Sequence, residues 1–122
     1  MTLMTEDTLV RVCSLSDLEI ERGRAALVDV QQIALFLLAD GTVRAVDNFD
    51  PFSGANVISR GIVGTRGDAA TIASPLHKQV FDLATGRCLD SQGKRTVDGA
   101  DAVLQVWPVR IIGNDVHIEV SS

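Results

Sequence analysis

Hydrophobic and polar positions alternate along short stretches of this chain, and turn residues separate the stretches. Alternation with a period of two is typical of β-strands, whereas an apolar stripe with a period near 3.6 indicates a helix. About nine short strands at close spacing predict an all-β fold, either a small β-sandwich or a barrel. The expected strands lie at residues 9–13, 25–30, 33–39, 42–47, 62–63, 71–73, 80–83, 87–89, 103–112 and 116–120.

Four local features refine this pattern. Residues 33–39 are apolar throughout, which indicates a strand covered on both faces. Asp40 and Gly41 follow it and predict a type I′ hairpin turn, whose two central residues need positive φ. Pro108 has no N–H to donate, so we expect an edge strand or a bulge there. Only residues 14–22 favour a helix, and we expect one or two turns at most.

The length of 122 residues predicts a single domain over 1–122. We expect residues 1–8 to form a flexible N-terminal arm and the polar segment 90–101 to form a mobile surface loop. The apolar run 33–39 is much shorter than the roughly 20 residues of a membrane span. The N-terminal segment also lacks the basic and then apolar pattern of a secretory signal, so we expect a cytoplasmic protein.

Charge and candidate chemistry narrow the possible functions. Eleven basic and 16 acidic residues give a net charge of −5, which argues against nucleic acid and against an anionic membrane as partner. Cys13 and Cys88 are too far apart for a two-cysteine metal motif, and we predict free thiols. Trp107 is expected in the core or at its rim, and His117 is expected to face solvent. No catalytic residues are assigned, because neither a P-loop nor a nucleophile elbow occurs.

Two loops carry patterns that strands do not require. The first spans residues 45–54 (AVDNFDPFSG) and the second spans 73–86 (ASPLHKQVFDLATG). Rieske ferredoxins have a Cys-x-His loop and then a Cys-x-x-His loop, which is followed by Phe-Asp-x-x-Thr-Gly. Residues 81–86 match that tail, and Pro75 stands where the family has proline after its second cysteine. The chain therefore resembles the Rieske iron–sulfur family over roughly residues 9–120, which implies a Rieske-like [2Fe–2S] ferredoxin fold.

The resemblance does not extend to the cluster ligands. A Rieske cluster needs two cysteine thiolates and two histidine imidazoles. Those positions fall on Asp50, Phe52, Ser74 and His77. Carboxylate and hydroxyl oxygens suit the soft cluster iron poorly, and a phenyl ring cannot ligate. We therefore expect no [2Fe–2S] cluster and no metal on this chain, with Phe49 and Phe52 filling the space and His77 hydrogen-bonded to neighbouring backbone.

This set of replacements is similar to that of the NirD family, the small subunits of bacterial NAD(P)H-dependent nitrite reductase. The matching segments are 33–36 (IALF), 50–54 (DPFSG), 59–62 (SRGI) and 74–79 (SPLHKQ). The resemblance implies a non-catalytic accessory subunit that binds and supports a large subunit. That partner would carry FAD, siroheme, a [4Fe–4S] cluster and the NAD(P)H site, and would reduce nitrite to ammonium in nitrate assimilation. The alternative is a stand-alone, cluster-free Rieske-like binding module or an accessory domain of another oxidoreductase.

In a Rieske fold the two loops meet at one tip of the domain. Apolar residues and one cation there suit contact with a protein better than catalysis, whereas the alternative is a packed relic of the cluster site. The residues expected to contact the partner are Asp50, Pro51, Phe52, Ser53, Leu76, His77, Lys78 and Gln79.

Overall fold

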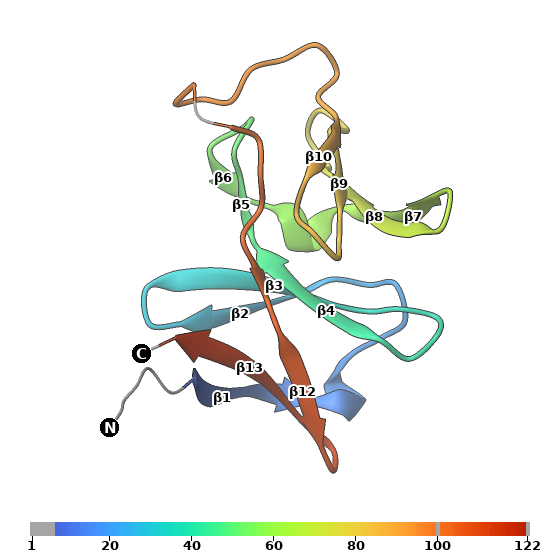
Figure 1. Cartoon of the computed structure of the whole chain (residues 1–122), viewed down its shortest axis with the longest axis vertical. Helices are drawn as coiled ribbons and strands as arrows, with labels where there is room; N and C mark the ends of the chain where they lie inside the picture. Colours follow the sequence, from blue (N-terminus) through green and yellow to red (C-terminus); the bar gives the residue numbers. More distant parts are fainter. Residues whose placement is uncertain (1–6, 100, 122) are drawn as a thin grey trace.

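The described part of the chain, residues 7–99 and 101–121 of a computed structural model, folds into three small antiparallel sheets and one two-stranded ribbon (Figure 1). Residues 1–6 of the expected N-terminal arm lie outside the described residues, and residues 7 and 8 belong to β1. The first sheet has the strand order β1 (Asp7–Ser14), β13 (Asp115–Ser121) and β12 (Val109–Ile112). The second sheet has the order β11 (Val106–Trp107), β4 (Val43–Asp47), β3 (Gln31–Leu37) and β2 (Arg24–Val28). The third sheet has the order β10 (Cys88–Asp90), β9 (Val80–Asp82), β8 (Ala69–Ala73) and β7 (Ile62–Arg66). The ribbon pairs β5 (Phe49–Asp50) with β6 (Ala55–Asn56).

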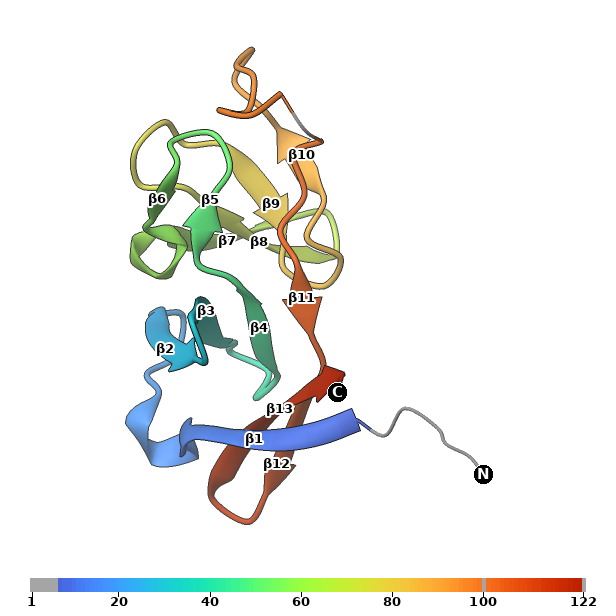
Figure 2. The same cartoon turned by 90° about the vertical axis from the view of Figure 1, so that its left-hand side faces the viewer.

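Strand β3 lies between two hydrophobic cores. Ala34 and Phe36 face the core shared with the third sheet and the two loops, whereas Ile33 and Leu35 face the core shared with the first sheet. All four side chains are buried, which confirms the strand predicted to be covered on both faces. Figure 2 shows β3 and β4 between the β1–β13–β12 sheet at one end and the loop-bearing sheet at the other.

The all-β Rieske-like architecture is confirmed, with several local differences. Residues 24–28 and 31–37 form the strands expected one or two positions later. The loop between β4 and η2 (Ile58–Arg60) contains the short ribbon that alternation did not predict. The predicted helical segment contains a three-residue 3₁₀ helix, η1 (Leu15–Asp17). Pro108 separates β11 from β12, so the expected long strand belongs to two different sheets.

The hairpin between β3 and β4 forms, but the predicted type I′ turn is wrong. Only Gly41 has a positive φ, of 88°, and its N–H donates to the Leu38 carbonyl at 2.9 Å. The Asp40 carboxylate accepts the Thr42 N–H at 2.9 Å, which holds the turn without a positive φ at Asp40. A left-handed glycine following a tight turn is the arrangement of a bulged hairpin.

Trp107 is buried in the core next to the first sheet, as predicted. His117 was expected to face solvent but is half-buried, because Arg11 and Arg110 stand directly opposite it on the two neighbouring strands. Cys13 and Cys88 are free thiols, as predicted, and burial raises the pKa of both.

Gly86 marks the point where the hairpin after β9 meets the returning chain. It has a φ of 78°, and its carbonyl accepts the Leu104 N–H at 2.8 Å. A Cβ at this position would overlap the Leu104 carbonyl oxygen. Only glycine therefore allows this contact.

We expect Gly86→Ala to lower the free energy of unfolding by at least about 3 kcal/mol, because steric overlap adds to an unfavourable φ. Gly67→Ala is the matched control: Gly67 also has a positive φ, of 59°, but no atom lies within 4 Å of the added Cβ. It should cost only about 1–2 kcal/mol. Urea unfolding of both variants measures the difference, and equal losses would contradict the assigned contact.

Candidate functional site

The first loop is organised by a buried carboxylate. Asp50 is fully buried, and its Oδ1 accepts the Phe52 N–H at 2.9 Å. Its backbone carbonyl accepts the Gly54 N–H at 2.8 Å, where Gly54 takes a φ of 75°. The side chain and the backbone of Asp50 thus both accept hydrogen bonds from the turn between β5 and β6. Asp50 therefore has a structural role at the position where the Rieske family has its first cysteine.

The second loop is joined to the first by one side-chain hydrogen bond. The buried Ser74 hydroxyl donates to Asp50 Oδ2 at 2.6 Å. Ser74 also closes its own loop, because its N–H donates to the Gln79 carbonyl at 2.8 Å and its carbonyl accepts the Lys78 N–H at 3.1 Å. Lys78 has a φ of 63°, which is uncommon for a residue other than glycine. The two former cluster loops are thus held together by a carboxylate and a hydroxyl.

Phe52 packs into the core beneath these loops. It is buried, and its ring centroid lies 6.0 Å from that of Phe81 with the rings tilted by 53°. Phe49 was expected to fill the same space, but 39% of its surface is exposed. It lies on the short ribbon, where successive side chains point to opposite faces of the strand, so only one of Phe49 and Asp50 can be buried. Of the two aromatic residues in the first loop, only Phe52 therefore packs into the space under the loops.

These residues do not fit a [2Fe–2S] cluster. Both Asp50 oxygens already accept hydrogen bonds, Ser74 is the donor to one of them, and Phe52 offers no ligand atom. His77 is exposed, and no hydrogen bond joins it to another described residue, so the expected bond to neighbouring backbone is wrong. Within residues 7–99 and 101–121, no three His, Cys, Asp or Glu side chains lie close enough to hold a metal ion.

The structure divides the eight residues expected to contact a partner. Asp50, Phe52 and Gln79 are buried, so their side chains cannot form such a contact in this conformation; this part of the expectation is corrected. Packing beneath the loops requires them to face inward. The other members are half-buried or exposed: Pro51, Ser53, Leu76, His77 and Lys78.

Sequence patterns did not identify two residues of the site, Asn48 and Val97. Asn48 is buried; its Oδ1 accepts the Ser59 N–H at 2.7 Å, and its Nδ2 donates to Gln32 Oε1 at 3.0 Å. Val97 belongs to the segment after β10, and its N–H donates to the Pro51 carbonyl at 2.8 Å. Because the contact uses the Val97 backbone, its side chain gave no signal in the sequence. The only available signal for Asn48 was its place directly after Asp47, since Asp and Asn both favour turns.

The carboxyl group of Asp47, in the first loop, has a shifted pKa. Burial raises the pKa of Asp47, and the Phe49 N–H, which donates to Asp47 Oδ1 at 3.0 Å, acts against that rise. The shift favours the protonated form of a structural carboxyl group.

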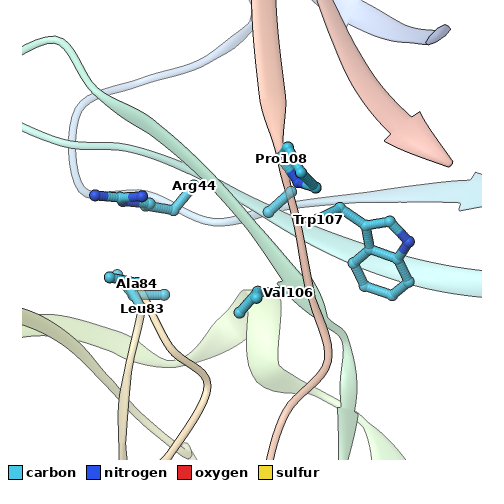
Figure 3. Close-up of a pocket in the computed structure, with 7 residues that line it drawn as sticks. Arg44, Leu83, Ala84, Val106, Trp107 and Pro108 are labelled. Carbon is cyan, nitrogen blue, oxygen red and sulfur yellow. The ribbon is translucent and has the colours of Figure 1, made fainter. Parts of the chain in front are cut away.

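A separate hollow of about 280 Å³ lies between β4, β11 and the turn that follows β9 (Figure 3). Arg44 is the one charged residue of its lining, and Ala84, Val106 and Pro108 make much of the rest. The Trp107 indole is turned away from Arg44 and Ala84. None of the described residues that line this hollow is a nucleophile or belongs to an acid–base pair.

Comparison with known proteins places these loops in a family. Residues 8–119 match the family model described as the Rieske-like [2Fe-2S] domain. The nitrite reductase (NADH) small subunit of Escherichia coli K12 is 35% identical over 82 residues, which cover 66% of this chain and 76% of that protein. This chain belongs to the family of Rieske-like nitrite reductase small subunits. The family predicted from the two loops is confirmed.

Two further relatives extend the match. The crystal structure of a putative NADH-dependent nitrite reductase small subunit from Mycobacterium tuberculosis has a TM-score of 0.81 and 38% identity, and the match covers 96% of this chain and 98% of that one. The nitrite reductase [NAD(P)H] large subunit of Klebsiella oxytoca is 36% identical over 107 residues, 88% of this chain. The chain spans only 10% of that large subunit's length. Among the described residues of this chain, there is no helix long and apolar enough to cross a membrane.

The Asp50–Ser74 contact is testable by removing its donor. We expect Ser74→Ala to lower the free energy of unfolding by about 1.5–3 kcal/mol, because a buried carboxylate oxygen loses its hydrogen bond. Ser53→Ala is the control in the same pair of loops, since half-buried Ser53 makes only a 3.4 Å contact with the Ala55 N–H. It should change stability by less than about 0.5 kcal/mol. Similar values for both variants in urea unfolding would contradict the structural role of Ser74.

A substitution at Gln79 is expected to raise the free energy of unfolding rather than lower it. Its side chain is fully buried, and neither Nε2 nor Oε1 has a hydrogen-bond partner among the described residues. We expect Gln79→Met, a change of similar volume, to raise the free energy of unfolding by about 1 kcal/mol. Gln32→Met is the control and should lower it by about 1 kcal/mol, because Gln32 Oε1 accepts the Asn48 amide at 3.0 Å. A loss of stability in Gln79→Met would contradict the prediction that the Gln79 amide is unsatisfied in the folded protein.

Proposed function

We propose that this chain is a non-catalytic accessory subunit of NAD(P)H-dependent nitrite reductase. It binds and supports the large subunit, which reduces nitrite to ammonium in nitrate assimilation in the cytoplasm. The observation that carries the proposal is the match between 88% of this chain and a tenth of the Klebsiella oxytoca large subunit. A domain that is covalently part of a large subunit in one relative is expected to associate with it non-covalently where it is a separate chain.

The chemistry of the two loops supports a role without catalysis on this chain. Asp50 and Ser74 are engaged with each other, and Phe52 fills the space beneath them. FAD, siroheme, the [4Fe–4S] cluster and the NAD(P)H site are accordingly assigned to the large subunit. This chain contributes a rigid surface rather than a redox centre.

The partner-binding surface is proposed at the ends of the two loops. Pro51 and Ser53 are half-buried, whereas Leu76, His77 and Lys78 are exposed, with 52% of Leu76 accessible. A large aliphatic side chain held on an exposed, internally hydrogen-bonded loop is typical of a protein contact. The Asp50–Ser74 bond fixes the positions of both loops before binding.

Co-purification tests this function. The tagged protein is recovered from nitrite-grown cells, and NAD(P)H-dependent nitrite reduction is assayed on the eluate. We expect a large chain that carries flavin and siroheme to co-elute with that activity. Elution of the protein alone, or with an unrelated oxidoreductase, would overturn the proposal in favour of a separate binding module.

A pair of substitutions tests whether the large subunit binds at the ends of the two loops. Leu76→Asp should reduce co-elution of the large chain by about tenfold, because it puts a charge into the proposed interface. Val30→Asp is the matched control, since Val30 is 98% exposed in the turn between β2 and β3 and belongs to neither of the two loops. It should co-elute like the unmodified protein. Equal recovery with both variants would contradict the location while leaving the subunit function in place.

A further inference from the structure

A third loop joins the two former cluster loops. Residues 91–99 follow β10, and the Val97 N–H donates to the Pro51 carbonyl at 2.8 Å. The Val97 methyl groups also lie 3.7 and 3.8 Å from the place where a Cβ would stand on Gly54. Figure 2 shows all three loops at the same end of the molecule. We call residues 51–54, 74–79 and 91–99 together the tip surface.

The tip surface has a charge opposite to that of the rest of the chain. It contains Lys78, Lys94 and Arg95, with Asp98 as its one acidic residue, so its net charge is 3 − 1 = +2. The whole chain carries 11 basic and 16 acidic residues. The remainder therefore has 11 − 3 = 8 basic and 16 − 1 = 15 acidic residues, a net charge of −7. The three loops therefore carry a positive net charge within a chain that is negative as a whole.

The three cations are available for a partner. Lys78, Lys94 and Arg95 are all exposed. The ion pairs found among the described residues use Arg11, Arg22, Arg66 and Arg110, and none of the tip cations takes part. Their charges are therefore not neutralised by carboxylates of the described chain.

Exposed apolar side chains accompany these cations. Val97 is 59% exposed, and Leu76 on the neighbouring loop is similarly accessible. A site for a polyanion such as nucleic acid requires cations but no exposed aliphatic groups, and the surrounding charge of −7 would repel a long polyanion. Aliphatic side chains flanked by cations match a protein interface with an apolar centre and a charged rim.

We propose that the tip surface docks on an acidic patch with an apolar centre on the large subunit. Leu76 and Val97 provide the apolar contact, and Lys78, Lys94 and Arg95 lie around them. This inference rests on the proposed function and names the chemistry of the partner's surface. Complementary charge acts mainly on the rate of association, and salt screens it.

The experiment compares two charge-reversal variants in binding to the purified large subunit from the same organism. Lys94→Glu/Arg95→Glu alters the tip surface. Arg22→Glu/Arg24→Glu is the matched control, because Arg22 and Arg24 are also exposed and lie outside the three loops. Each double substitution changes the net charge from −5 by −4, so the total charge of the two variants is equal. Thermal unfolding confirms that both variants fold.

We expect the tip variant to associate about tenfold more slowly than the unmodified protein at low salt, and the control within about twofold. Raising the salt concentration should slow association of the unmodified protein and affect the tip variant less. If the unmodified protein does not bind the large subunit, the proposed function fails. If it binds and the two variants associate equally fast, the docking surface is overturned while the function stands. The proposed docking surface would also be overturned by a different result with duplex DNA. In that result the unmodified protein binds DNA, the tip variant alone loses this binding, and both proteins bind the large subunit equally well.

Discussion

The hydrogen bond from the Ser74 hydroxyl to the Asp50 carboxylate determines how the two former cluster loops are arranged. A carboxylate buried without partners would be strongly unfavourable, so its oxygens have to meet donors. Asp50 meets one on its own loop, from Phe52, and one on the neighbouring loop, from Ser74. The requirement to satisfy one buried group therefore fixes two loops at once, and the third loop attaches to this pair through the Pro51 carbonyl. In a Rieske protein a cluster links the corresponding loops, and here two small polar side chains link them.

The loops depend in turn on what lies beneath them. Phe52 and Phe81 fill the core under the tip surface, and Phe36 of β3 closes the same core from below. Asn48 ties the start of the first loop to Gln32 at the beginning of β3 and to Ser59 beyond the ribbon. The two loops 51–54 and 74–79 of the proposed surface are consequently positioned by buried contacts rather than formed on binding. Such preorganisation reduces the entropy that association has to overcome.

Much of the fold could be predicted from the sequence, because it is encoded in short patterns. An apolar run indicated β3, and the tail of the second loop indicated the family. The details that could not be predicted are those set by the backbone conformation of the loops and by main-chain hydrogen bonds. Periodicity has no meaning in a loop, so nothing distinguished buried Gln79 from exposed Lys78 beside it, or buried Phe52 from exposed Phe49. The contact of Val97 with the first loop is made by a main-chain N–H, which every residue except proline has.

The position of β3 between two cores has a consequence for cooperativity. Its alternate side chains belong to different cores, so loss of this strand removes one wall from each. The two halves of the domain therefore cannot open independently, although they are built on separate sheets. The backbone amides of β3 should exchange with solvent only through global unfolding, and both halves should lose their structure in a single transition. A destabilising change at either end of the molecule should therefore also lower the stability of the other end, because both cores share β3.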